Sequence, residues 1–180
     1  MSAIQINDKQ FIPFISENEI KIKVKELANQ LSNDYQHKKP LFIVILNGSF
    51  MFASDIFKEL KIEAEISFIK LASYKGMKSS GEVITSIGLD NNITDRDIII
   101  VEDIIDTGKT LFHFLPQLLQ QKPNSLKVAV LLDKPEPRKY DVTIDYKCFT
   151  IENKFVVGYG LDYDGLGRNI NCIYQLDTKD

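Results

Sequence analysis

The stretch that decides the fold is residues 98–110, which read IIIVEDIIDTGKT. Its first four residues form a continuous run of branched apolar side chains, typical of a strand that is covered on both faces. After Gly108, apolar side chains return at helical spacing. They are Leu111, Phe114, Leu115, Leu118 and Leu119. We therefore predict a buried strand, a polar strand-to-helix loop over residues 101–110, and a helix that Pro116 kinks or shortens.

The rest of the chain alternates strands and helices in the same way. Ser16 and Glu19 have the spacing of a capping box, which predicts a helix start, and the apolar stripe that follows predicts a helix to about Asp34. A second helix is predicted over residues 49–60. The predicted strands are 41–46, 64–71, 83–89, 126–132, 147–151, 155–159 and 170–176, with a turn at Asn91-Asn92.

This order of elements predicts an α/β fold with a mostly parallel sheet. The last forty residues contain only short strands and loops, and we expect them to form an antiparallel appendage. In open α/β sheets, ligands bind in the crevice at the carboxyl ends of the strands. The loops that follow Leu46, Leu71, Val101 and Leu132 all belong to that edge, so the chemistry is expected there.

Composition narrows the class of protein. The chain has 180 residues, which fits a single domain, and its net charge of −3 is unlike the basic surface of a nucleic-acid-binding protein. Cys148 and Cys172 lie in no CxxC or Cys/His cluster, so we expect two free thiols and no structural zinc. No basic and apolar leader opens the sequence, and no apolar run is long enough to span a bilayer. We expect a soluble, cytoplasmic protein.

The polar loop has the residues to bind a sugar phosphate together with a divalent metal. A helix N-terminus offers unpaired amides to a phosphate, and Gly108 lets the backbone approach it closely. Thr107 and Thr110 add hydroxyl donors. The carboxylates of Glu102 and Asp103 would repel a phosphate but attract ribose hydroxyls and magnesium.

Two other interpretations of the loop fit its residues less well. A nucleotide-hydrolysing P-loop needs a glycine where this chain has Asp103, and three carboxylates would oppose a triphosphate. A loop whose acids only cap the helix would explain Asp106, but not a Glu-Asp pair at a strand end as well. The sugar-phosphate interpretation fits all of these residues.

Residues 98–110 closely resemble the phosphoribosyl-diphosphate signature of the type I phosphoribosyltransferases, and in particular of their hypoxanthine-guanine branch. The resemblance extends from the strand at Leu41 to near Tyr174. It implies one domain over residues 1–180: a core over about 16–134, and an antiparallel hood from about 1–15 and 135–180. It also implies a mobile loop near residues 72–82, in which Ser73 and Tyr74 close over the reaction centre.

The resemblance also implies roles for individual residues. Glu102 and Asp103 would bind the ribose, and Asp106 to Thr110, including Lys109, would hold the 5′-phosphate. Asp106 would also handle a purine proton. The other implied contacts are Lys134, Phe155 and Val156 with the purine, Asn47, Gly48 and Arg168 with pyrophosphate, and Asp162, Glu102 and Asp103 with the metal. Taken singly, several of these have blander interpretations, such as a solvated Lys134 or a core Phe155.

One position departs from the family pattern. Asn47 stands where many members have a basic residue, and whether the Leu46-Asn47 bond is cis is left open. The implied activity is transfer of a phosphoribosyl group to hypoxanthine or guanine with Mg²⁺, by a homodimer or homotetramer that pairs near the first loop. A xanthine- or adenine-preferring enzyme and a non-catalytic sensor of phosphoribosyl diphosphate are the alternatives. No nucleic-acid or membrane partner is expected.

Overall fold

The computed structural model describes residues 2–73, 83–87 and 92–177. In chain order its elements are β1 (Ile4–Ile6), β2 (Lys9–Ile15), α1 (Glu17–Asp34), β3 (Leu41–Leu46), α2 (Phe50–Glu59), β4 (Glu65–Ser73), β5 (Val83–Ile87), β6 (Asp97–Ile105), α3 (Lys109–Leu119), β7 (Ser125–Asp133), β8 (Tyr146–Thr150), β9 (Val156–Val157) and β10 (Ile173–Leu176). The three predicted helices and the predicted strands that correspond to β3 through β7 are confirmed to within four residues, whereas β1 and β2 were not predicted as strands. Tyr74, most of the loop predicted at 72–82, Leu89 and Asn91 lie outside the described residues.

The core is a six-stranded sheet in the order β5-β4-β3-β6-β7-β8. Strands β4, β3, β6, β7 and β8 run parallel, and β5 is antiparallel to β4. The prediction of an antiparallel appendage is wrong for β8, which pairs in parallel with β7. A parallel pair needs a crossover of about a dozen residues, and residues 134–145 supply it. Tyr146 and Cys148 of β8 are buried in the same hydrophobic cluster as the apolar side chains of α1.

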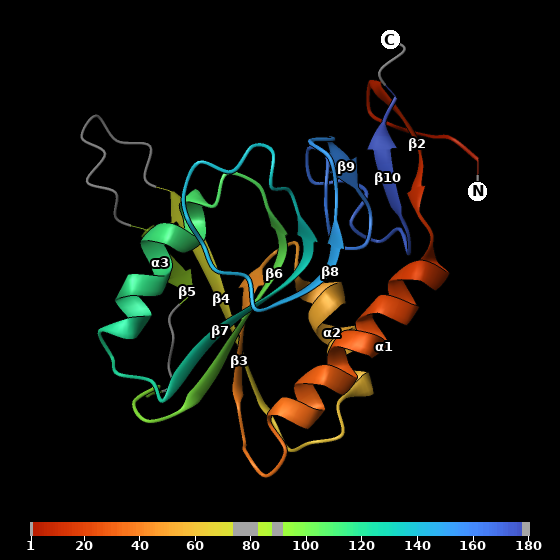
Figure 1. The fold of residues 1–180 in the computed structure, drawn as a ribbon. Coiled ribbons are helices and arrows are strands. Elements are labelled where there is room, and N and C mark those ends of the chain that lie inside the picture. Colours follow the sequence, from red (N-terminus) through yellow and green to blue (C-terminus); the bar gives the residue numbers. More distant parts are fainter. Residues whose placement is uncertain (1, 74–82, 88–91, 178–180) are drawn as a thin grey trace, which may run out of the picture.

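Helices cover both faces of this sheet, α1 and α2 on one face and α3 on the other (Figure 1). The alternation along β3 explains the two layers, because successive side chains of a strand point to opposite faces. Phe42 and Val44 pack in the cluster that contains α1 and α2. Ile43 and Ile45 pack in the cluster that contains α3. All four side chains are buried, which accounts for the continuous apolar run in the sequence.

Strand β6 is longer than predicted. Glu102, Ile104 and Ile105 continue the parallel ladder with β7, so the strand ends at Ile105 and not at Val101. Glu102 and Asp103 are therefore strand residues, and the loop before α3 is only residues 106–108. The reason is that hydrogen bonding to a neighbouring strand outweighs the poor strand propensity of two acids.

A second sheet of four antiparallel strands, in the order β1-β2-β10-β9, lies beside the carboxyl ends of the core strands (Figure 1). It joins the N-terminal segment to the C-terminal one, since Phe11 of β2 lies opposite Leu176 of β10. Strand β9 stops earlier than predicted. Gly158 and Tyr159 have φ of 98° and 49°, a conformation that cannot continue a strand.

The local signals in the helices have different outcomes. At the start of α1 the Ser16 hydroxyl accepts from the Glu19 amide, and the Glu19 carboxylate accepts from the Ser16 amide, so the capping box is confirmed. Helix α3 continues to Leu119 with Pro116 inside it, so the prediction that Pro116 shortens the helix is wrong. Both cysteines are free thiols, as expected. None of the helices in the described part of the chain is long and apolar enough to cross a membrane.

Candidate active site

The loop before α3 forms a small polar pocket. Gly108 caps the helix with φ of 79°, and a Cβ at this position would lie 2.7 Å from the Tyr140 carbonyl oxygen, so only glycine fits. The pocket has a volume of about 260 Å³ and is lined by Glu102 and by residues 104–111. The first amides of α3 have no partner within the helix, and with Thr107 and Thr110 they could bind a phosphate.

Glu102 and Asp103 lie at the end of β6, beside this pocket. Burial raises the pKa of the Glu102 carboxyl well above its usual range, and the neighbouring Asp103 raises it further. Its Oε2 atom is buried and has no hydrogen-bond partner among the described residues. Burial also raises the pKa of Asp103 to about 6, although the Ile104 amide donates to its Oδ1 at 2.9 Å. A polyol with hydroxyl donors, or a cation, would satisfy both carboxylates.

The loop after β3 lies directly against Asp103. A Cβ at Gly48 would stand 1.5 Å from the Asp103 Oδ2 atom, so glycine alone permits this approach. On the other side, a Cβ at Gly160 would meet the Gly48 carbonyl oxygen. The Leu46-Asn47 bond is cis, and Asn47 is exposed. Three segments far apart in the sequence thus meet at the acidic pair.

Asp162 and Arg168 belong to the same meeting point. They form an ion pair of 2.6 Å, and Arg168 Nη1 donates to the Gly160 carbonyl oxygen at 2.7 Å. The Gly165 amide donates to Asp162. Asp162 is therefore engaged within the protein. Among residues 2–73, 83–87 and 92–177, no three acidic, His or Cys side chains lie together as a preformed metal site.

The loop before α3 is tied to the end of β7 by an ion pair. Lys134 Nζ lies 3.0 Å from Asp106 Oδ1; the lysine side chain is 6% exposed and the aspartate 48%. Lys134 is therefore not a solvated loop lysine, because its side chain is buried next to a half-exposed carboxylate. An ammonium group has three donors, so two remain for a ligand.

Phe155 has an exposed ring. Its side chain is 48% exposed, and its ring packs against Phe11 and Tyr163 at centroid distances of 6.2 and 5.8 Å. Val156 is buried in β9. The ring is therefore anchored on one side and free to stack with a planar ligand on the other. Ser73 ends β4, and Tyr74 lies outside the described residues.

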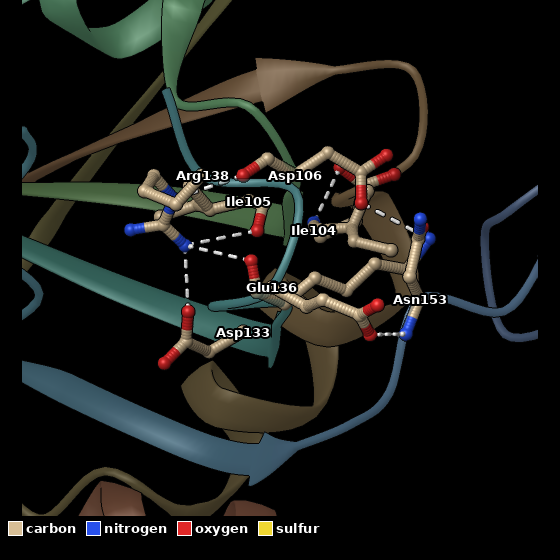
Figure 2. Close-up of polar contacts among 9 residues, drawn as sticks. Ile104, Ile105, Asp106, Asp133, Glu136, Arg138 and Asn153 are labelled. Atoms are coloured by element: carbon tan, nitrogen blue, oxygen red, sulfur yellow. Dashed lines mark hydrogen bonds and ion pairs between the residues drawn. The ribbon is translucent and has the colours of Figure 1, made fainter. Parts of the chain in front are cut away.

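Three residues of this region, Asp133, Arg138 and Ser49, were not predicted from the sequence. Asp133 is buried at the end of β7 and pairs with Arg138 at 2.6 Å and with Lys147 at 3.1 Å. Figure 2 shows Arg138 reaching from its own loop to Asp133 and to the backbone of Ile105 and Asp106. The one usable signal was Asp133 itself, an acid that ends a run of apolar strand residues. Ser49 was missed too; its hydroxyl is buried without a partner in the described structure.

Comparison with known proteins agrees with this geometry. Residues 15–164 match the family model of the phosphoribosyl transferase domain. A hypoxanthine-guanine phosphoribosyltransferase of Streptococcus pyogenes is 47% identical over 165 residues, which cover 91% of this chain and 92% of that protein. The corresponding protein of Streptococcus thermophilus is 43% identical over the same shares of the two chains.

Solved structures agree as well. A hypoxanthine-guanine phosphoribosyltransferase from Bacillus anthracis superposes with a TM-score of 0.87 at 40% identity, over 92% of this chain and 98% of that one. A hypoxanthine phosphoribosyltransferase from Staphylococcus aureus gives a TM-score of 0.88 at 40% identity, over 99% and 98%. The chain therefore belongs to the phosphoribosyltransferase family, in its hypoxanthine-guanine branch, and is a pentosyl-transferring enzyme.

Proposed function

We propose that this enzyme transfers the 5-phosphoribosyl group of 5-phospho-α-D-ribosyl 1-diphosphate to hypoxanthine or guanine, as a step of purine salvage. The observation that carries the proposal is the Lys134–Asp106 pair of 3.0 Å, because it joins the phosphate pocket to the end of β7. A base held by Lys134 would then lie next to the ribose that the loop before α3 binds. The names of the relatives support the choice of base.

Each part of the sugar has a matching group in this arrangement. The α3 amides, Thr107 and Thr110 bind the 5′-phosphate, and Glu102 and Asp103 accept hydrogen bonds from the ribose hydroxyls. The unpartnered Glu102 Oε2 supports this, because a ribose hydroxyl would supply the missing donor. Backbone amides at Asn47 and Gly48, with Arg168, hold the pyrophosphate.

The base has its own set of contacts. Lys134 donates to the 6-oxo group, which selects against a 6-amino purine, and Phe155 stacks on the ring while Val156 offers backbone groups to its edge. In the reaction the bond from the ribose C1 to the pyrophosphate oxygen breaks, and a purine nitrogen bonds to C1. The proton that the purine loses passes to Asp106, which its 48% exposure leaves accessible.

Magnesium fits as a group that enters with the substrate. The carboxylates of Glu102, Asp103 and Asp162 are hard oxygen donors of the kind that Mg²⁺ prefers, but they form no preformed cage in the described structure. When bound, the ion would neutralise the diphosphate and ease its departure. The protein side chains would then touch the ion mainly through the substrate and water.

We also propose a homodimer or homotetramer and a cytoplasmic location. The exposed ring of Phe50, directly after the Asn47-Gly48 loop, supports pairing near that loop. We propose that residues 1–180 act as one domain, because Gly160 of the C-terminal segment packs against Gly48 of the core. Light scattering after size exclusion tests the assembly; a monomer at micromolar concentration would contradict it.

The experiment for the proposed function is pyrophosphate release from phosphoribosyl diphosphate with each of five bases. Hypoxanthine and guanine should react, and adenine and uracil should not; a preference for xanthine would correct the substrate. Activity with none of the five would favour a sensor of phosphoribosyl diphosphate instead.

A pair of lysine variants tests the assignment of the two halves of the site. Lys134→Ala should raise the KM for the purine by roughly tenfold or more, with little change for phosphoribosyl diphosphate. Lys109→Ala, on the phosphate side, should raise the KM for phosphoribosyl diphosphate and change the KM for the purine little. An equal rise in both constants for Lys134→Ala would indicate that Lys134 is structural.

A further inference from the structure

Arg138 holds the backbone at the end of β6 without lying in the phosphate pocket itself. Its Nε donates to the Asp106 carbonyl oxygen at 2.8 Å, and its Nη2 donates to the Ile105 carbonyl oxygen at 3.0 Å (Figure 2). The same Nη2 lies 2.6 Å from Asp133 Oδ1, and this carboxylate is buried. The fork of the guanidinium thus bridges the end of β6 to the end of β7.

The two residues after Arg138 continue the contact. The amides of Lys139 and Tyr140 both donate to the Thr107 carbonyl oxygen, at 3.1 and 3.0 Å. The Tyr140 ring lies 5.1 Å from the ring of Phe112 in the first turn of α3. Each carbonyl oxygen from residue 105 to 107 is therefore bound by a donor from residues 138–140.

These contacts have an electrostatic consequence for a phosphate. Carbonyl oxygens repel an anion and amides attract it, so an anion-binding loop needs its carbonyls held elsewhere. Residues 138–140 hold three of them. Because Asp106 also pairs with Lys134 across the same gap, Arg138 fixes the proton acceptor relative to the purine-binding lysine.

We infer that Arg138 is a positioning residue for this enzyme: it holds the phosphate loop and Asp106 in the geometry that binds phosphoribosyl diphosphate. The inference rests on the proposed function. Arg138 acts through the backbone of Ile105 and Asp106, and its side chain does not line the phosphate pocket. The two carbonyl contacts require the fork of a guanidinium, since the single ammonium of a lysine cannot span both.

The test compares Arg138→Lys and Arg138→Gln with the wild-type enzyme and with Arg96→Gln. Arg96 is a matched control, because it also forms a partly buried ion pair, with Glu65 at 2.7 Å, and it lies just before the start of β6. The measurements are KM for phosphoribosyl diphosphate, KM for hypoxanthine, kcat and the thermal midpoint. Arg138→Lys keeps the charge beside Asp133 and so is expected to fold.

We expect Arg138→Lys to raise the KM for phosphoribosyl diphosphate about tenfold and to lower kcat, with a thermal midpoint close to that of the wild type. Arg138→Gln should raise this KM further and lower kcat further. Arg96→Gln should change only the thermal midpoint.

Two results would overturn the inference. One is a KM and a kcat in Arg138→Lys that equal those of the wild type. That result would mean that only the positive charge beside Asp133 matters, and not the contacts with the two carbonyl oxygens. The other is a drop in thermal midpoint alone in both variants. If the wild-type enzyme itself released no pyrophosphate with any base, the proposed function would fail instead, which keeps the two failures distinct.

Discussion

Two acids near the carboxyl edge of the core sheet differ in their partners. The Asp133 carboxylate at the end of β7 forms ion pairs with Arg138 and Lys147. The Oε2 atom of Glu102, in the neighbouring strand β6, has no hydrogen-bond partner in the described structure. Asp133 ends β7 and Glu102 lies three residues before the end of β6, so both acids are near the carboxyl edge of one parallel sheet. Asp133 is buried, and so is the Oε2 atom of Glu102. At Asp133 the protein supplies the compensation for burial through Arg138 and Lys147. At Glu102 the Oε2 atom has no partner among the described residues, and burial raises the pKa of the carboxyl.

The difference separates a structural acid, Asp133, from Glu102, the acid proposed to bind the ribose. A buried carboxylate with good partners holds segments together, and here it fixes Arg138 against the loop before α3. A buried carboxylate without partners destabilises the free protein and is satisfied when a ligand arrives. Asp106 stands between the two, since it belongs to the β6 side and pairs with Lys134 of the β7 side.

The largest expected effect is on kcat, and it comes from changing Asp106, which pairs with Lys134. Asp106→Asn should lower kcat by roughly 10²–10⁴-fold, because the amide cannot accept the purine proton. The dissociation constant for phosphoribosyl diphosphate, measured by calorimetry, should stay within about threefold, because the amide keeps most of the loop's backbone contacts. An unchanged kcat would show that Asp106 has no proton role.

The next effect tests the structural side of the comparison. Asp133→Asn should lower the free energy of unfolding by about 3 kcal/mol, because it leaves Arg138 partly buried without its counter-charge. Urea unfolding measures this. The control Glu65→Gln, which removes the exposed partner of Arg96, should change it far less. Similar losses in the two variants would mean that Asp133 is not the structural acid described above.

The pH dependence tests the ligand-binding side. The folded-state pKa of Asp103 is raised to about 6, so the folded state holds this proton more tightly than the unfolded state. This group therefore lowers stability as the pH rises from about 4 to about 6, and adds no further change above that. Asp103→Asn removes the effect.

The free energy of unfolding of Asp103→Asn, relative to the wild type, should therefore rise by about 2 kcal/mol between pH 4.5 and pH 7. Urea unfolding across this range provides the measurement. A difference between the two proteins that stays constant with pH would contradict the raised pKa.

The smallest effect on stability is expected at Glu102, and in the opposite direction to Asp133. Glu102→Gln should leave the free energy of unfolding at pH 8 unchanged or raise it by about 1 kcal/mol, because it removes a buried carboxyl that is costly to ionise. Affinity for phosphoribosyl diphosphate should fall in the same variant. A loss of stability like that of Asp133→Asn would abolish the distinction between the two acids.

What the sequence by itself determined is local. The spacing of apolar residues located the three helices, the capping box located the start of α1, and the order of acids, threonines and glycine in residues 101–110 indicated the type of ligand. These features depend on a few consecutive residues, because helix and strand periods and the amides of a helix start are local properties.

What only the tertiary structure decided depends on residues far apart in the chain. The parallel pairing of β8, the extension of β6 to Ile105, the approach of Gly160 to Gly48 and the contacts of Arg138 with the β6 backbone all required the neighbouring strand or loop to be in place. No short pattern around Arg138 shows that its partner is 32 positions away. The sheet brings such partners together, because parallel strands place their carboxyl ends at one edge.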